Sequence, residues 1–176
     1  MSARRQRQMC IRDRFRIYYS NDLIGTQIGG ALKNIYAIAA GIAEGLNLGE
    51  NAKSALISRS FAEMTRYAKK FKADKNTLFG LSGLGDLILT CSSKNSRNTQ
   101  FGIKLASSKY DNFLSLLKSQ EVTEGYYTVK AVYNISQKKN IDMPIMESVY
   151  NILYKQHDLK EELSNLLSRP ITEEKI

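Results

Sequence analysis

Apolar residues recur at helical spacing along most of the chain. Between residues 22 and 45 they fall at every third or fourth position, within an arc of roughly 120° when each residue turns by about 100°. These positions are Ile24, Ile28, Leu32, Ile35, Ile38 and Ile42. Asn21 and Asp22 supply an N-cap before this run, and Gly45 and Gly49 loosen the chain after it. The pattern predicts a long amphipathic helix.

The same spacing continues through the rest of the sequence. A second long helix is predicted after Asn51, which we interpret as its N-cap. Its expected inward stripe is Ala55, Leu56, Met64, Tyr67, Ala68 and Phe71. Further helices are predicted at about 75–80, 84–90, 96–107, 111–118, 124–139, 144–155 and 159–168. Pro144 and Pro170 stand where helices begin or have ended, and only residues 15–20 are β-prone, as the tail end of a strand. We predict an all-α bundle.

Size and composition narrow the class of protein. At 176 residues and 43% hydrophobic content, the chain suffices for one well-buried core in a single domain. The longest apolar stretch, residues 23–46, is interrupted by Lys33 and Glu44, so no membrane span is expected. Cys10 and Cys91 form neither a disulfide framework nor a metal-ligand pattern, and no secretory cleavage signal is visible. A cytoplasmic location without a metal site is expected.

The formal net charge of +9 is unevenly distributed. Residues 1–14 hold five arginines and one aspartate, whereas the remaining charges are interleaved. Interleaved charges are typical of a solvated surface rather than of a phosphate-binding stripe. Residues 9–14, MCIRDR, resemble a translated sequencing-adapter sequence. We therefore expect residues 1–14 to be a non-native tail and residues 15–176 to form the helical domain; a native basic tail is the alternative.

One cation stands inside the first predicted helix. Within GGALKNIYAIAAG, Lys33 points opposite to Ile24 and Ile42. The residues on its own face are Thr26, Gly29, Gly30, Ala37, Ala40 and Gly41. Such small residues allow a backbone or a ligand to approach closely. An ordinary surface lysine fits the wheel geometry, but no charged residue occupies its i±3 or i±4 positions. Covered by a second domain, its ammonium group would transfer a proton or stabilise a developing alkoxide.

A glycine-rich stretch provides a second candidate site. In GLSGLGDLILT, Gly83 and Gly85 permit a tight turn that brings Asp86 to a helix start or a cleft edge. The alternative is that Asp86 only caps the short helix that follows. The stretch lacks the third glycine that a dinucleotide-binding fingerprint requires.

The sequence NSRN, shortly after this stretch, has the composition of an anion site. Ser96 and Asn98 offer hydroxyl and amide donors at a helix N-terminus, and Arg97 offers a planar guanidinium for phosphate oxygens. A plain N-cap beside a surface arginine explains the same residues equally well.

Together these motifs resemble the NAD(P)-dependent glycerol-3-phosphate dehydrogenases of the bacterial type. The resemblance covers about residues 19–169, in the order and with the spacing of the family. The combination of GGALKN, GLGDL and SRN is far more specific than any one of these motifs. The matching stretches are SNDLIGTQIGGALKNIYAIAAGIAEGLNLGENAKSALISRSFAEMTR, FGLSGLGDLILTCSSKNSRNTQFG, VTEGYYTVKAV and DMPIMESVYNILY.

The resemblance implies a fold and a reaction. The fold is the helical C-terminal substrate domain, a bundle of the 6-phosphogluconate-dehydrogenase C-terminal-like type. The reaction is reversible hydride transfer between NAD(H) or NADP(H) and the central carbon of glycerol 3-phosphate or dihydroxyacetone phosphate, for glycerophospholipid synthesis. Lys33 is then the general acid/base. The implied substrate-binding residues are Lys33, Asp86, Ser96, Arg97 and Asn98, and the implied cofactor-binding residues are Arg97, Val122 and Glu124. A homodimer is compatible with the resemblance.

Two other classes of function remain open from the sequence. One is the substrate domain of another hydroxyacid dehydrogenase, acting on a carboxylate. The other is a basic helical nucleic-acid-binding module, supported by a pI of about 9.5 and ten tyrosines. His157, in the polar stretch KQHDLK, is expected to be a surface residue without a role.

We expect this polypeptide to be inactive, or nearly so, by itself. Members of the family begin with a Rossmann domain that binds the cofactor, and no such element precedes Tyr18. Hydride transfer requires the nicotinamide to be held against the substrate carbon. The face that this domain covers should expose apolar or small residues and favour self-association. Mixing the protein with dihydroxyacetone phosphate and NADH or NADPH while following nicotinamide absorbance tests the expectation, which robust turnover would contradict.

Overall fold

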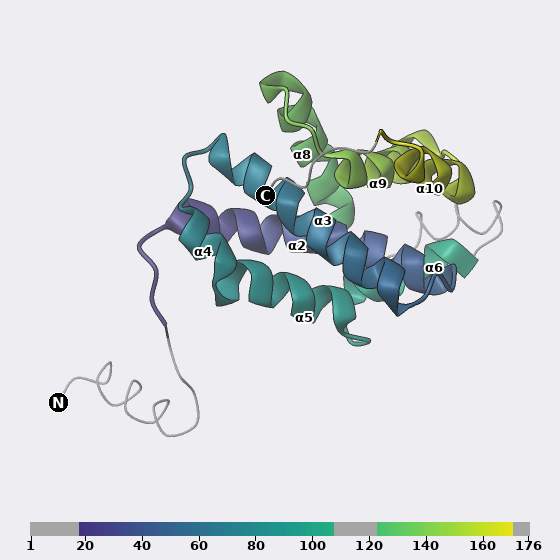
Figure 1. Ribbon diagram of the computed structural model, residues 1–176, viewed down its shortest axis with the longest axis horizontal. Coiled ribbons are helices and arrows are strands. Elements are labelled where there is room, and N and C mark those ends of the chain that lie inside the picture. Colours follow the sequence, from purple (N-terminus) through teal and green to yellow (C-terminus); the bar gives the residue numbers. More distant parts are fainter. Residues whose placement is uncertain (1–17, 108–122, 171–176) are drawn as a thin grey trace.

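The computed structural model describes residues 18–107 and 123–170, and within them every regular element is helical (Figure 1). The predicted all-α class is confirmed for this part of the chain. Residues 18–20 have no regular structure, so the β-prone reading of that stretch is wrong there. The predicted helix at 111–118 and residues 15–17 lie outside the described residues.

The helix bounds follow the predicted segments closely. Helix η1 is one turn of π-helix between two short α-helices, where the sequence predicted a single helix at 84–90. Pro144 is the first residue of its helix, as expected of a residue without a backbone N–H. The elements are α2 (Leu23–Gly45), α3 (Glu50–Lys69), α4 (Lys75–Phe79), η1 (Leu81–Gly85), α5 (Asp86–Ser92), α6 (Arg97–Ser107), α8 (Glu124–Lys139), α9 (Pro144–Lys155) and α10 (Leu159–Leu167).

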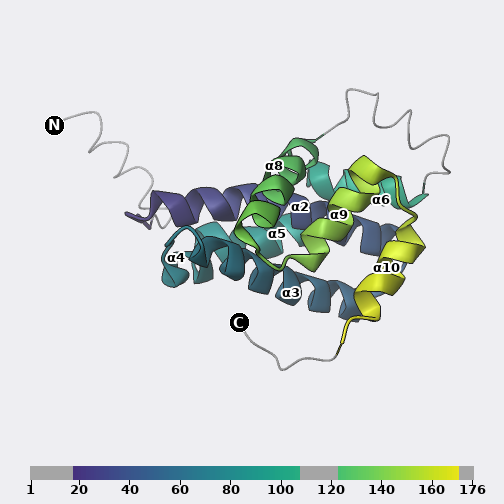
Figure 2. The same ribbon diagram turned by 90° about the horizontal axis from the view of Figure 1, so that it is seen from above.

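Helix α2 runs along the molecule with the other helices packed around it (Figures 1 and 2). It contacts α3, α4, η1, α5, α6, α8 and α9. From Ile35 to Ala43 every side of the helix is buried. The predicted inward stripe is buried from Leu32 to Ile42 but is wrong at its beginning, where Ile24 is 49% exposed. Past Ile35 the opposite face is buried as well. A helix enclosed on all sides is apolar all round, so its sequence carries little amphipathic signal there.

The two predicted N-caps have different outcomes. Asp22 caps α2, because its carboxylate accepts a hydrogen bond from the Gly25 N–H at 2.8 Å. It also accepts from the Asp74 N–H at 2.8 Å and so ties α2 to the start of α4. The cap predicted at Asn51 is wrong: α3 begins after Gly49, whose φ of 87° favours glycine.

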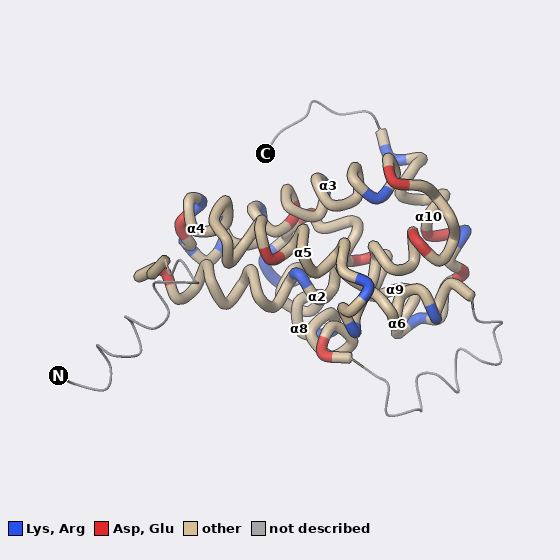
Figure 3. Tube along the Cα trace, turned by 90° about the horizontal axis from the view of Figure 1, so that it is seen from below, with Lys and Arg blue, Asp and Glu red and all other residues tan. Residues whose placement is uncertain are grey.

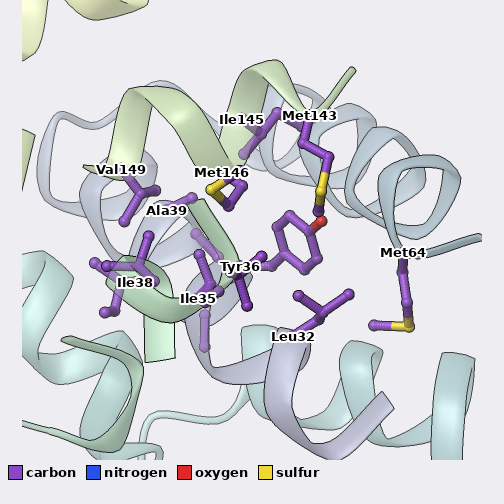
Figure 4. Packing of buried hydrophobic residues seen from close by; sticks show 14 of the residues in the cluster. Leu32, Ile35, Tyr36, Ile38, Ala39, Met64, Met143, Ile145, Met146 and Val149 are labelled. Atoms are coloured by element: carbon purple, nitrogen blue, oxygen red, sulfur yellow. The ribbon is translucent and has the colours of Figure 1, made fainter. Parts of the chain in front are cut away.

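The stripe predicted for α3 is correct in its second half. Met64, Tyr67 and Ala68 are buried, and two further members of the stripe are partly buried against the same core. Ala55 is exposed, contrary to the prediction. The core is centred on α2, and Figure 4 shows Tyr36 between Met64 of α3 and the two methionines at the beginning of α9, Met143 and Met146.

Glycines let α2 and α6 touch through their backbones. A Cβ placed on Gly41 would overlap the carbonyl oxygen of Thr99, and one placed on Gly102 would overlap the carbonyl oxygen of Ile38. Gly29 meets the η1 backbone at Ser82 in the same way. Gly29 and Gly41, two of the small residues on the face of Lys33, therefore make room for neighbouring helices rather than for a ligand.

We expect Gly41→Ala to lower the free energy of unfolding by about 2–3 kcal/mol, because the added methyl group overlaps backbone that cannot move aside. Gly30→Ala is the matched control on the same helix. A Cβ on Gly30 meets no atom within 4 Å, so replacing glycine in a helix should add up to about 1 kcal/mol. Urea unfolding of both variants measures the difference. Equal stabilities would show that the α2–α6 contact tolerates a side chain.

Candidate functional site

Lys33 of α2 and Asp86 of α5 form a half-buried ion pair. The Lys33 Nζ lies 2.5 Å from Asp86 Oδ2, and the two side chains are 24% and 31% exposed. Gly85 is the N-cap residue of α5 and Asp86 is its first residue, and among the described residues the Asp86 carboxylate accepts hydrogen bonds from Lys33 and Thr90 only. The carboxylate is thus committed to the lysine, so the interpretation of Asp86 as a helix cap is wrong.

The local backbone explains how Asp86 reaches Lys33. The turn of π-helix η1 packs on α2 where Gly29 permits close approach, and it leads directly into α5. Gly83 is needed within that turn, since a Cβ there would overlap the backbone of Leu78. The predicted tight turn at the glycines therefore exists, and it delivers Asp86 to the lysine of α2.

Two threonines extend this cluster. Thr90, one turn after Asp86, places its Oγ1 2.6 Å from the Asp86 carbonyl oxygen and 3.3 Å from Asp86 Oδ1. Thr99 of α6 donates its hydroxyl to the Thr90 carbonyl at 2.9 Å. Neither threonine was predicted from the sequence. The i+4 spacing of Thr90 from Asp86 was the available signal.

Asn34, the neighbour of Lys33, connects α2 to the other candidate motifs. Its Oδ1 accepts a hydrogen bond from Asn98 Nδ2 at 3.0 Å, and its Nδ2 lies 3.5 Å from Glu124 Oε2. Asn98 Oδ1 in turn accepts from the Gly125 N–H at 3.1 Å. Asn34 was also missed, although it stands in the GGALKN motif that drew attention to Lys33.

Arg97 and Glu124 form an exposed ion pair beside Asn34. The Arg97 guanidinium lies 3.0 Å from Glu124 Oε1, and the side chains are 79% and 69% exposed. Ser96 Oγ accepts from the Thr99 N–H at 3.3 Å and so acts as an N-cap of α6. Asn98 is buried, with both of its polar atoms engaged. Within the SRN motif, Arg97 is therefore the residue whose side chain is exposed to solvent.

The predicted residues thus form two adjoining clusters rather than one continuous network. Lys33 and Asp86 belong to the first, and Asn98, Arg97 and Glu124 are joined through Asn34 in the second. In residues 18–107 and 123–170, no hydrogen bond links Lys33 to the SRN residues. Val122 lies outside the described residues. Lys33 and Asn34 are consecutive on α2, so the two clusters adjoin along this helix, although the two side chains leave it about 100° apart.

Large apolar side chains are exposed on the two helices that carry the ion pair and on the two elements that precede α5. They come from α2, α4, η1 and α5. Those more than 45% exposed are Leu23, Ile24, Phe79, Leu81, Ile88 and Leu89. That this is the face covered by a Rossmann domain, and that it favours self-association, stays a prediction.

Other candidate chemistry is limited in the described part of the chain. It contains no group of three or more His, Cys, Asp or Glu side chains arranged to hold a metal ion. None of its helices is both long and apolar enough to cross a membrane. His157 is exposed as expected, and its Nδ1 lies 2.7 Å from the buried carboxylate of Glu162. Burial raises the pKa of the Cys91 thiol to about 12, so this cysteine is a poor nucleophile.

The all-helical domain is the fold that the resemblance implies for a dehydrogenase substrate domain. Residues 22–164 match the family described as NAD-dependent glycerol-3-phosphate dehydrogenase C-terminus. The chain belongs to this family, and the resemblance inferred from its motifs is confirmed.

Individual relatives agree with the family match. The chain is 47% identical over 156 residues to a glycerol-3-phosphate dehydrogenase [NAD(P)+] of Colwellia psychrerythraea, covering 89% of this chain and 46% of the relative. It is 46% identical over 158 residues to that of Staphylococcus carnosus, covering 89% of this chain and 47% of the relative. The crystal structure of a glycerol-3-phosphate dehydrogenase from Coxiella burnetii has a TM-score of 0.80 and 38% identity, covering 96% of this chain and 53% of that one. The chain thus spans about half the length of these relatives.

Replacing Asn34 by alanine should loosen the contact between α2, α6 and α8. The change removes the partner of the buried Asn98 amide, and an unsatisfied buried polar group costs about 1–3 kcal/mol. We expect that loss in urea unfolding, together with weaker hydrogen-exchange protection of the Gly125 N–H. Asn165→Ala, at an exposed position of α10, is the control. An Asn34→Ala protein as stable as this control would contradict a connecting role for Asn34.

Proposed function

We propose that this chain provides the substrate site of an enzyme that interconverts dihydroxyacetone phosphate and glycerol 3-phosphate with NAD(H) or NADP(H). The observation that carries the proposal is the Lys33–Asp86 pair, because it holds a half-buried ammonium group in a fixed position. Family membership supports the same reaction. The enzyme would serve glycerophospholipid synthesis in the cytoplasm, and a homodimer remains a prediction.

Lys33 acts as the general acid when the ketone is reduced. As a hydride reaches the central carbon, the carbonyl oxygen gains negative charge and takes a proton from the Lys33 ammonium group. In the reverse direction the neutral amine accepts the hydroxyl proton. Asp86 positions the ammonium group through its 2.5 Å contact, and the Thr90 hydroxyl lies 3.3 Å from the other carboxylate oxygen of Asp86. A fixed donor avoids the reorganisation that a freely moving lysine would require.

The phosphate group is assigned to the beginning of α6. Arg97 has the planar guanidinium that suits phosphate oxygens, and it is exposed. Ser96 keeps a hydroxyl proton to donate while its oxygen caps the helix. Asn98 acts indirectly, because its amide is buried between Asn34 and Gly125.

The nicotinamide cofactor, when bound, supplies or accepts the hydride. The exposed Arg97–Glu124 pair fits a cofactor edge, since a guanidinium binds phosphate or carbonyl oxygens and a carboxylate accepts from hydroxyl or amide groups. Asn34 holds the Glu124 carboxylate from α2. Val122 is assigned to the cofactor by resemblance alone. In this way one polar cluster faces the cofactor while its neighbour on α2 carries the proton.

A nucleic-acid-binding role receives less support. Lys and Arg alternate with Asp and Glu along the described helices instead of forming a continuous basic track (Figure 3). Several tyrosine rings stack on one another between α8 and α9, for example Tyr133 on Tyr150 with ring centroids 3.7 Å apart. Ring faces used in this way are not available to bases.

A chimera tests the proposed role of Lys33. Residues 18–176 are joined to the N-terminal half of the Colwellia psychrerythraea relative, and oxidation of NADH or NADPH by dihydroxyacetone phosphate is measured. We expect Lys33→Ala to lower kcat by about 10²- to 10⁴-fold, as loss of a general acid does, with unchanged circular dichroism.

The matched control for this chimera is Lys53→Ala. Lys53 forms a comparable half-buried ion pair, 2.6 Å from Glu44, and should leave kcat near the parent value. A kcat of the Lys33→Ala chimera within about ten-fold of the parent value would contradict the role of Lys33 as general acid and base. Preference for a carboxylate-bearing ketone over dihydroxyacetone phosphate would favour the other hydroxyacid dehydrogenases instead.

A further inference from the structure

Glu63 is a buried carboxylate outside the site described above. It lies on the inner face of α3 and is 1% exposed. Its Oε1 accepts a hydrogen bond from the Ile145 N–H at 2.6 Å, and its Oε2 accepts from the Met146 N–H at 3.2 Å. Oε2 also accepts from the Tyr36 hydroxyl at 3.2 Å. Three helices therefore meet at one carboxyl group.

The carboxyl group takes the place of an N-cap for α9. The first N–H groups of a helix have no partner within that helix, and Met143, the N-cap residue of α9, makes no side-chain cap hydrogen bond. Glu63 binds two of these N–H groups from another helix. A negative charge at a helix N-terminus is stabilised by the helix dipole, which partly offsets the burial of this carboxylate.

The third contact leads to the helix of the functional site. Tyr36 is fully buried and lies on α2, three residues after Lys33. Figure 4 shows its ring reaching toward Met143, at the beginning of α9. The Glu63–Tyr36 hydrogen bond thus connects α2 to the α3–α9 junction.

Little positive charge balances Glu63. Among the described residues no lysine, arginine or histidine lies within ion-pair distance of it. Arg66, one turn further along α3, is the cation whose charge lowers the pKa of Glu63. Its Nε donates a hydrogen bond to the Asp142 carbonyl at 2.8 Å rather than to Glu63. On α2 the titratable neighbour of Glu63 is Tyr36, and Cys91 of α5 contributes to raising the pKa of this tyrosine. From α9 only backbone N–H groups reach the carboxyl.

Burial therefore decides the protonation of this group. Loss of hydration raises the pKa of Glu63 to about 7, while the hydrogen bonds from α9, the Arg66 charge and the Tyr36 hydroxyl work in the opposite direction. Burial also raises the pKa of Tyr36 well above its usual range, so the tyrosine stays neutral.

We propose that Glu63 is a proton-operated latch that holds the N-terminus of α9 against α3 and α2 when protonated and loosens this junction when ionised. In the protonated state the carboxyl oxygens still accept from the Ile145 and Met146 N–H groups. A single O–H then bridges the Glu63 and Tyr36 oxygens, and the second hydroxyl proton of the pair points away from this contact. In the ionised state the carboxylate accepts all three hydrogen bonds, but its charge is buried without an ion-pair partner, and the junction opens to hydrate that charge. The latch does not depend on the proposed enzymatic reaction.

The free energy of unfolding should then fall as the pH rises. The unfolded chain releases the Glu63 proton near pH 4.5, and the folded chain holds it to about pH 7. The folded state therefore binds more protons in between, and stability is lost as the pH rises through that range. Urea unfolding at pH 5 and pH 8 should show a roughly ten-fold or larger increase in the unfolding constant attributable to Glu63.

Glu63→Gln removes the titration and keeps an acceptor for α9. We expect this variant to lose that part of the pH dependence, while the control Glu161→Gln, at an exposed position of α10, retains it. Hydrogen-exchange protection of Ile145 and Met146 should fall with pH in the wild type and in the control only. Equal pH dependence in wild type and Glu63→Gln would overturn the proposal.

A second measurement covers the case in which Glu63→Gln does not fold. The ¹³C shift of the Glu63 carboxyl, followed against pH in the wild type and in Tyr36→Phe, reports the titration directly. We expect a midpoint near neutrality that moves upward in Tyr36→Phe, because that change removes a donor to the carboxylate. Titration in the ordinary range of a glutamate would overturn the latch.

Discussion

The close packing of backbone around α2 is the constraint on which the rest of the structure depends. Gly29, Gly41 and Gly102 leave no room for a Cβ, so η1 and α6 lie directly against the central helix. This approach places Asp86 near Lys33 and Asn98 near Asn34. The polar groups of the site are thus held by helices whose own positions are set by the packing of small residues.

Sequence periodicity predicted the helices well because most of them bury one face. The α8 and α9 bounds agree with the predicted ranges, and Pro144 marks its helix start. Prediction was weaker where the local signal was ambiguous. Asn51 and Gly49 both suit the beginning of α3, and only the backbone conformation of Gly49 decides between them.

The charged residues of the site could be predicted from the sequence, whereas the hydrogen bonds that connect them to neighbouring helices could not. Lys33 drew attention because an isolated cation in an apolar helix is unusual. Asn34 and Thr90 did not, since short polar side chains are common on helix surfaces, and their partners become visible only when α5, α6 and α8 are packed together. The small residues near Lys33 were read as space for a ligand, whereas Gly29 and Gly41 are filled by backbone. Sequence alone does not distinguish these two uses of glycine.

The consecutive positions of Lys33 and Asn34 have a mechanical consequence. Neighbouring side chains on a helix point about 100° apart, so one helix serves two clusters that face different directions. Turning α2 about its axis would displace both side chains in the same rotational sense. The ammonium group and the amide would then leave their partners together, and the geometry of the two clusters is set by a single rotational coordinate.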